Sequence, residues 1–181
     1  ISYILTIEPT TSFWDCGEYI ATAYKLQVGH PPGSPLFLLI GNLFSQLAFG
    51  NLEKVAMMIN LMSALCSALT ILLLFWTIKM FIKKINRETS DNIVNISAAV
   101  GALVYAFSDS FWFSAVEGEV YAMSSFFTAL VFWAIMKWDS VYEVDQKANK
   151  WLLLIAYLIG LSIGVHMLNL LAIPAIVLIY Y

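Results

Sequence analysis

The feature that most constrains the fold of this chain is a long apolar run from Val55 to Ile82. As an α-helix it would be about 42 Å long, and the hydrocarbon core of a bilayer is about 30 Å thick. The run therefore predicts a tilted membrane-spanning helix. The composition agrees, because only 12% of the residues are charged, whereas soluble domains carry about 25%. An ordinary soluble enzyme, a secreted disulfide scaffold and a disordered linker are thereby excluded.

Two further runs, 93–114 and 120–138, also have the length and composition of membrane spans, and a short turn with glutamates separates them. The run 35–49 would reach only about 22 Å as a helix and follows helix-breaking prolines. We interpret it as an interfacial helix that does not cross the membrane. Together these runs predict an all-α, polytopic transmembrane helical bundle.

The remaining segments fit the same architecture. Residues 139–150 are charged and predict a loop, whereas 151–181 are apolar apart from a polar interruption at 164–169. Residues 1–8 are predicted to be the end of a helix. Because both ends lie in apolar sequence, we expect the chain to be a fragment cut within helices, and no signal peptide is visible at its start.

The basic residues predict the orientation of the spans, because positively charged short loops face the cytoplasm. Seven of the nine basic residues lie in two loops separated by an even number of crossings. These seven are Lys79, Lys83, Lys84, Arg87, Lys137, Lys147 and Lys150. The turn at Glu117 then faces outward, and so does His166, about 24 Å along a helix from Lys150. Segment 8–34 is also outside if 35–49 is interfacial, and inside if that run crosses.

This topology gathers polar side chains at the outer face of the membrane. Ionisable residues near membrane depth are costly and are therefore candidates for a functional site. The set is Asp15, Glu18 and His30 in the first loop, Asp109, Glu117 and Glu119 in the second, and His166 and Asn169 in the third.

Asp15 and Glu18 are three residues apart and would share one face of a helix. One carboxylate could raise the proton affinity of the other, or both could orient a hydroxyl group or a cation. This arrangement suits a general base. The alternative for Asp15 is structural, because the spacing from Ser12 to Asp15 matches a capping box. A capping box of Ser12 and Asp15 would not account for the presence of Glu18.

His30 begins the string His30-Pro-Pro-Gly, whose prolines favour an extended backbone. A histidine held there could donate to a phosphate or a carboxylate, and the alternative is a surface turn. Glu117 and Glu119 could bind a divalent cation or the polar groups of an acceptor, although their spacing is typical of no particular metal. Ser114 and Glu117 also match a capping box.

His166 and Asn169 are three residues apart and would share a helix face, and the alternative for His166 is a packing role. No glycine-rich phosphate loop, Ser-His-Asp pattern or nucleic-acid patch is present in the sequence. Cys16 and Cys66 fit neither a zinc spacing nor a disulfide framework. We therefore predict no metal ligands among the site residues and no nucleic-acid partner.

Several strings together resemble one protein family. Segment 9–20 contains Trp-Asp-Cys-Gly-Glu, and segment 28–37 contains His-Pro-Pro-Gly. Both resemble the opening region of bacterial membrane glycosyltransferases of the protein O-mannosyltransferase-like family, which is typical of Bacteroidetes. Segments 115–121 and 164–174 are also similar to parts of that family, so the resemblance covers nearly the whole chain.

The resemblance implies that residues 1–181 are the N-terminal part of a GT-C-like transmembrane domain with interfacial helices in its first extracytoplasmic loop. Such enzymes transfer a sugar, here expected to be mannose, from a polyprenyl-phosphate carrier to Ser or Thr hydroxyls of exported proteins, with inversion. The expected location is the bacterial inner membrane, with a periplasmic active face. The expected partners are the bilayer, the lipid-linked donor, the acceptor polypeptide and the protein export channel. Whether a divalent cation takes part in the reaction is left open.

The same resemblance implies roles for the site residues. Asp15 would be the general base, with Glu18 orienting the acceptor or tuning Asp15. His30 and His166 would contact the lipid phosphate, assisted by Lys25 or Lys54, and the prenyl chain would lie between the long span and the interfacial helix. The further substrate-binding candidates are Glu117, Glu119, Tyr121 and Asn169. The competing class is a non-enzymatic membrane protein, either a transporter or a scaffold subunit of an export complex.

Overall fold

The computed structural model describes residues 1–145 and 147–180, and all regular structure in these residues is helical. The elements are α1 (Ser2–Leu5), α2 (Cys16–Lys25), α3 (Pro35–Ser45), η1 (Gln46–Ala48), η2 (Leu52–Lys54), α4 (Val55–Ile85), α5 (Asp91–Ala106), α6 (Asp109–Val116), α7 (Val120–Val141), α8 (Asn149–Ile163), η3 (Met167–Leu171) and α9 (Ala172–Tyr180). The prediction of an all-α protein is confirmed for the described residues.

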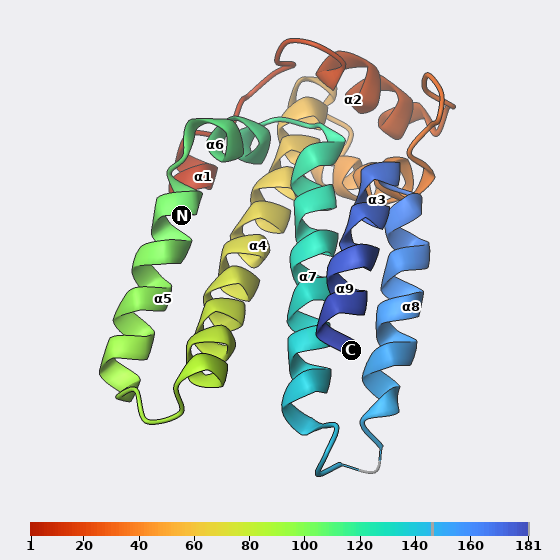
Figure 1. The fold of residues 1–181 in the computed structure, drawn as a ribbon. Coiled ribbons are helices and arrows are strands. Elements are labelled where there is room, and N and C mark those ends of the chain that lie inside the picture. The colour runs from red at the N-terminus through yellow and green to blue at the C-terminus, as the bar shows by residue number, and fades with distance from the viewer. Residues whose placement is uncertain (146, 181) are drawn as a thin grey trace.

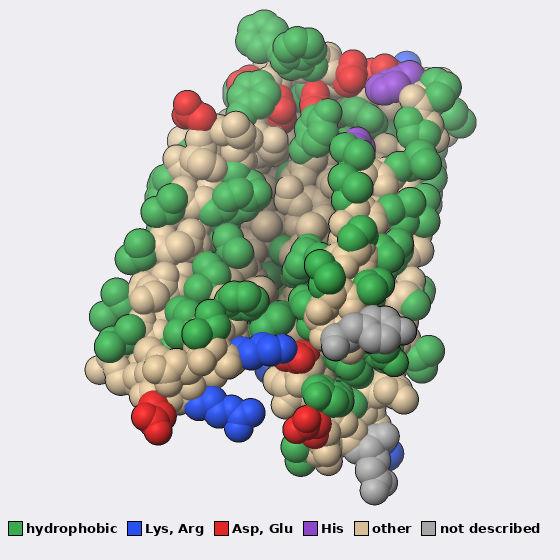
Figure 2. All heavy atoms as spheres, viewed as in Figure 1, with side chains coloured by type: hydrophobic (Ala, Val, Ile, Leu, Met, Phe, Trp, Pro, Cys, Tyr) green, Lys and Arg blue, Asp and Glu red, His purple; other side chains and the backbone are tan. Residues whose placement is uncertain are grey.

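Helices α4, α5, α7, α8 and α9 run side by side, and α2 lies across one end of this bundle (Figure 1). We call that end the α2 end, and we call the opposite end, which holds the α4–α5 and α7–α8 loops, the basic end. Figure 2 shows histidine and several acidic side chains at the α2 end, lysine and arginine side chains together with other acidic ones at the basic end, and an apolar band between the two ends. This distribution is typical of a helical bundle that spans a membrane.

Among the residues that the structure describes, two helices have the length and apolar composition needed to cross a membrane, namely 52–85, which combines η2 with α4, and α7. They match the predicted spans closely. The predicted span 93–114 is interrupted, because α5 and α6 are bent by 68° relative to each other, and the two helices are a candidate third crossing only as one broken span.

The break between α5 and α6 falls at Phe107 and Ser108, where Ser108 takes extended dihedral angles as the N-cap of α6. Apolar residues continue on both sides, so the hydrophobic pattern alone does not reveal it. The hydroxyl of Tyr3 in α1 donates to the Ala106 carbonyl over 2.8 Å. This bond satisfies one of the backbone acceptors that a helix end leaves free.

Other boundaries also differ from the prediction. The charged loop predicted at 139–150 is shorter, because α7 continues to Val141 and α8 begins at Asn149. Asp139 remains helical, and its carboxylate lies 2.6 Å from the Lys84 amine at the end of α4. The short run 35–49 forms α3 and η1, as its length suggested. Its position at a membrane interface stays a prediction.

Helices α2 and α3 pack closely together and are held against the bundle by a continuous apolar core. Phe37 and Ile59 are fully buried in that core. A Cβ on Gly41 would lie 3.0 Å from the Cβ of Ala23, so a glycine permits this close approach. The Asn42 side-chain amide donates to the Ala23 and Tyr24 carbonyls over 3.0 Å each, which satisfies the C-terminal end of α2.

A candidate polar site at the α2 end

A cavity of about 140 Å³ lies at the α2 end, where three loops that are distant in sequence meet. Five of the eight predicted site residues line it, namely Asp15, His30, Glu119, Tyr121 and His166. The expected meeting of the first, second and third loops is therefore observed. Glu18, Glu117 and Asn169 are outside this lining, and each has a different role in the structure.

Asp15 occupies the N-cap position of α2, and its side chain makes no capping hydrogen bond. The alternative role of Asp15 in a capping box from Ser12 is not observed, because the helix begins three residues later than that pattern requires. Trp14 precedes it with a positive φ of 59° and a side chain that is 87% exposed. Asp15 is left with an exposed carboxylate on the cavity wall.

Glu18 holds His30 in place. The backbone N–H of His30 donates to Glu18 Oε1 over 2.6 Å, and His30 Nδ1 lies 3.1 Å from Glu18 Oε2. These contacts, the backbone hydrogen bond first, lower the pKa of Glu18. A Cβ on Gly29 would lie 3.1 Å from Glu18 Oε1, so the loop passes very close to this carboxylate. In the structure Glu18 therefore contacts and orients His30, a residue of the cavity wall.

Glu119 is the carboxylate that lies near Asp15. Its pKa is raised, chiefly by burial and then by the negative charge of Asp15, and a hydrogen bond from the Asp15 backbone partly offsets this rise. Glu119 is only 5% exposed, although it is the N-cap residue of α7. Within the described part of the chain, its Oε1 has no hydrogen-bond partner.

Glu117 is buried, being 2% exposed, and does not line the cavity. Burial, with a smaller contribution from the negative charge of Glu119, raises its pKa to about 7. A hydrogen bond from the Ser12 side chain acts in the opposite direction and partly offsets this rise. The predicted capping box from Ser114 is wrong, because Ser114 lies inside α6 and its hydroxyl donates to the Ser110 carbonyl over 3.2 Å. Glu117 instead ends α6 in an extended conformation.

Asn60 of α4 is a site-supporting residue that the sequence analysis missed. It is fully buried, and its side-chain amide donates to the carbonyls of Glu8 (2.6 Å) and Thr10 (2.9 Å). A Cβ on Gly118 would lie 2.8 Å from Asn60 Oδ1, so the glutamate turn rests directly on this side chain. The sequence did contain a signal for this role, because Asn60 is an amide side chain within the first turns of an otherwise apolar span.

The backbone of the third loop accepts two hydrogen bonds from the segment that follows His30. The Ser34 hydroxyl donates to the Val165 carbonyl and the Leu36 N–H donates to the Gly164 carbonyl, both over 2.8 Å. His166 lines the cavity, with its ring 5.8 Å from that of Tyr121. Its Nδ1 accepts the N–H of Leu168 over 3.3 Å.

Asn169 lies away from the cavity and joins η3 to α7. Its Oδ1 accepts the hydroxyls of Ser124 (2.5 Å) and Thr128 (3.2 Å), and its Nδ2 donates to the Ser162 carbonyl over 3.3 Å. These contacts occupy both ends of the amide. In this conformation Asn169 supports the position of His166.

The cavity thus combines an exposed carboxylate that can accept a proton with two imidazoles that can donate to an anion. In the part of the chain that the structure describes, no three His, Cys, Asp or Glu residues are grouped in a way that could hold a metal ion. The arrangement suits proton abstraction from a hydroxyl beside a bound anionic group.

Comparisons with known proteins show the family. The family model described as protein O-mannosyl-transferase TMEM260 N-terminal domain matches residues 15–181. A protein O-mannosyl-transferase tmem260 of Dictyostelium discoideum is 29% identical over 131 residues, covering 72% of this chain and 15% of that protein. Protein O-mannosyl-transferase TMEM260 of Mus musculus is 30% identical over 168 residues, covering 92% of this chain and 21% of that protein.

The chain therefore spans only about a fifth of the length of these relatives or less. No solved structure is significantly similar to it. The resemblance to a protein O-mannosyltransferase-like family is confirmed, whereas a bacterial source stays a prediction. By the match over residues 15–181, the chain belongs to the protein O-mannosyl-transferase TMEM260 N-terminal domain family.

Proposed function

We propose that this chain is the membrane-embedded, GT-C-like part of an enzyme that transfers mannose from a polyprenyl-phosphate carrier to Ser or Thr hydroxyls of exported proteins. The observation that carries the proposal is the single cavity shared by Asp15, His30, Glu119 and His166. The names of the relatives support O-mannosyl transfer to proteins. The α2 end would face away from the cytoplasm, because the basic loops lie at the opposite end.

In this mechanism Asp15 accepts the proton of the acceptor hydroxyl while the hydroxyl oxygen forms a bond to the anomeric carbon of mannose. The bond from that carbon to the phosphate oxygen breaks with its electron pair, and polyprenyl phosphate leaves. Attack opposite the leaving group inverts the anomeric centre. Burial, and then the negative charge of Asp15, raise the pKa of Glu119, so this carboxyl group holds a proton more readily than an exposed glutamate does.

The leaving phosphate gains negative charge and needs hydrogen-bond donors more than a proton. His30 and His166 are the donors on the cavity wall. Because Glu18 engages Nδ1 of His30, Nε2 is the ring nitrogen left for a phosphate oxygen. Glu18 would therefore act as a positioning residue for donor binding.

We place the prenyl chain in a different groove from the one expected from the sequence. The space expected between α4 and α3 is filled, because Phe37 of α3 and Ile59 of α4 are fully buried in one core. A groove of about 490 Å³ instead lies between α4, α5 and α7, with apolar and hydroxyl-bearing walls. It begins at Ser124, one turn of α7 beyond Tyr121, so we assign the prenyl chain to this groove.

The test is transfer of radiolabelled mannose from polyprenyl-phosphate-mannose to a Ser/Thr peptide by purified full-length protein. We expect Asp15→Asn to lower transfer by at least about 100-fold. Asp109→Asn is the matched control, because Asp109 lines a separate hollow at the same end of the bundle. Full transfer by Asp15→Asn would move the base to Glu119. A wild-type protein inactive with this donor and with other polyprenyl-linked sugars would favour the transporter or scaffold class.

A further inference from the structure

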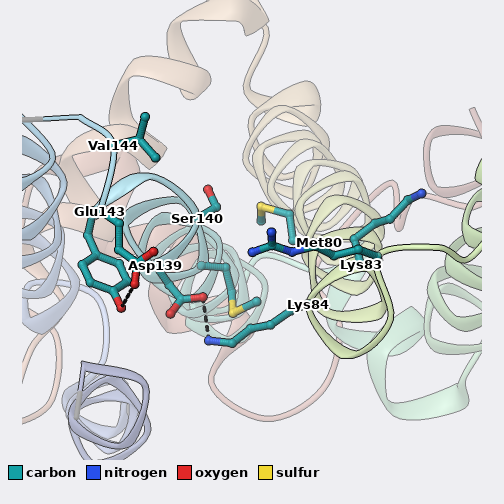
Figure 3. Close-up of a pocket in the computed structure, with 10 residues that line it drawn as sticks. Met80, Lys83, Lys84, Asp139, Ser140, Glu143 and Val144 are labelled. Carbon is teal, nitrogen blue, oxygen red and sulfur yellow. Dashed lines mark hydrogen bonds and ion pairs between the residues drawn. The ribbon is translucent and has the colours of Figure 1, made fainter.

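The basic end holds the largest of the cavities described here, about 700 Å³, between the C-terminal ends of α4 and α7 (Figure 3). Met80 of α4 and Met136 of α7 contribute apolar walls. Helix α7 has 22 residues and is about 33 Å long, which matches the thickness of the hydrocarbon core. A crossing by α7 therefore places this cavity at the depth of lipid headgroups, far from the site at the α2 end.

Most of the charges around this cavity already have partners. Lys84 is paired with Asp139 over 2.6 Å, which joins the ends of α4 and α7 (Figure 3). The amine of Lys83 lies 2.8 Å from Asp91 and donates to the Thr89 carbonyl over 2.7 Å. These two lysines are therefore largely neutralised by the protein itself.

Two charged groups on the cavity wall are left available. Arg87 has no hydrogen-bond or ion-pair partner among residues 1–145 and 147–180. Glu143 accepts one hydrogen bond, from the Tyr142 hydroxyl over 3.0 Å, and has no basic partner within the same described residues. One guanidinium and one carboxylate thus face a single hollow whose other charges are balanced.

We propose that this cavity binds the headgroup of a phospholipid that carries both a phosphate and a primary ammonium group, as phosphatidylethanolamine does. The guanidinium of Arg87 offers paired N–H donors that fit a phosphate. The carboxylate of Glu143 accepts N–H bonds from the ammonium group. The acyl chains leave the cavity along Met80 and Met136.

The charge pattern selects against the other common headgroups. An anionic headgroup without an amine, such as phosphatidylglycerol, satisfies Arg87 but leaves Glu143 facing a negative ligand. A choline headgroup has no N–H donor for Glu143. The binding preference therefore depends on Arg87 and Glu143 together, and it is independent of the transferase activity proposed above.

The proposal is tested by native mass spectrometry of the delipidated full-length protein in detergent, titrated with phospholipids that share the same acyl chains. We expect phosphatidylethanolamine to bind at least about tenfold more tightly than phosphatidylcholine or phosphatidylglycerol. Arg87→Gln should weaken its binding by about tenfold or more, since a charge-assisted bidentate contact is lost. Glu143→Gln should abolish the preference over phosphatidylcholine.

Lys147→Gln is the matched control, because Lys147 is an exposed base at the same end that does not line the cavity. It should bind like the wild type. Circular dichroism and a monodisperse elution profile show that each variant is folded. Equal affinity for the three lipids, or unchanged binding by Arg87→Gln, would overturn the proposal.

A second arm separates a lipid from a soluble phosphate compound as the source of the headgroup. Inorganic phosphate and glycerophosphoethanolamine are added at increasing concentration to the lipid-bound protein. We expect neither to displace phosphatidylethanolamine at equimolar concentration, because neither contacts the methionine walls. Displacement at equimolar concentration would contradict a lipid site.

Discussion

At the scale of single residues, the glutamate turn shows how burial changes the chemistry of a carboxyl group. Glu117 has a pKa raised to about 7 from its ordinary value of 4.5. Below about pH 4.5 the folded and unfolded states both carry the proton. Between these two values the unfolded state loses the proton and the folded state keeps it, so stability falls as the pH rises.

Glu117→Gln should therefore stabilise the protein above pH 7, by up to about 3 kcal/mol, and flatten the fall between about pH 4.5 and 7. The measurement is thermal unfolding of the purified protein in detergent over this pH range. Glu53→Gln, at an exposed position of the same end, is the control and should keep the wild-type slope. An unchanged slope in Glu117→Gln would show that another group is responsible.

The contact between Gly118 and Asn60 also acts at the scale of one residue. A Cβ on Gly118 would meet Asn60 Oδ1 at 2.8 Å and Ile20 Cγ1 at 3.1 Å. We expect Gly118→Ala to lower the free energy of unfolding by about 1–3 kcal/mol and to reduce transfer, because the turn that carries Glu119 must shift. In Gly160→Ala the new Cβ meets nothing within 4 Å. That control should be neutral or slightly stabilising in the same unfolding and transfer assays.

At the scale of elements, the hydrophobic pattern predicts α4 and α7 well but misses the break between α5 and α6. Length and apolarity suffice for α4 and α7, since lipid and core both require apolar side chains. The string Ser108-Asp109-Ser110 is typical of a helix start and was the available signal for the break. The break was not predicted because both flanking segments are apolar. When every face of a helix is apolar, the hydrophobic periodicity does not indicate where the helix axis changes direction.

Tyr3 provides a test of how the broken element is held. Tyr3→Phe keeps the edge contacts with Phe111 and Trp112 but leaves the Ala106 carbonyl without its 2.8 Å partner. We expect a loss of about 1–2 kcal/mol in the free energy of unfolding. Tyr157→Phe, in an exposed position of α8, is the control. Equal melting of the two variants would mean that water or lipid replaces the Tyr3 bond.

At the scale of the whole molecule, the charges divide between two ends of an apolar bundle (Figure 2). The sequence predicted that Glu119 and His166 lie at the same end, opposite the basic loops, and that Asp15 joins them if 35–49 does not cross the membrane. It did not predict the pairing of Glu18 with His30 or of Asp15 with Glu119. Those pairings depend on the fold of the loops, which hydropathy does not describe.

The orientation of the bundle can be tested with membrane-impermeant maleimide on intact cells. Phe13→Cys places a thiol at a position that is 78% exposed at the α2 end, and Lys147→Cys places one at the basic end. We expect only Phe13→Cys to be labelled before permeabilisation, and both afterwards. The wild-type protein reports the background from Cys16, which is buried, and Cys66. Labelling of Lys147→Cys alone in intact cells would reverse the assigned orientation.

The bond from Ser34 to Val165 joins residues that are 131 positions apart in the chain. At a synthesis rate of about 5–20 residues per second, the second partner is made roughly 7–26 s after the first. During that interval Asp15 and His30 exist without the wall that His166 supplies. A nascent chain therefore has an incomplete cavity until α8 and the turn after it have been made, so the transfer proposed above would begin only when this part of the bundle has assembled.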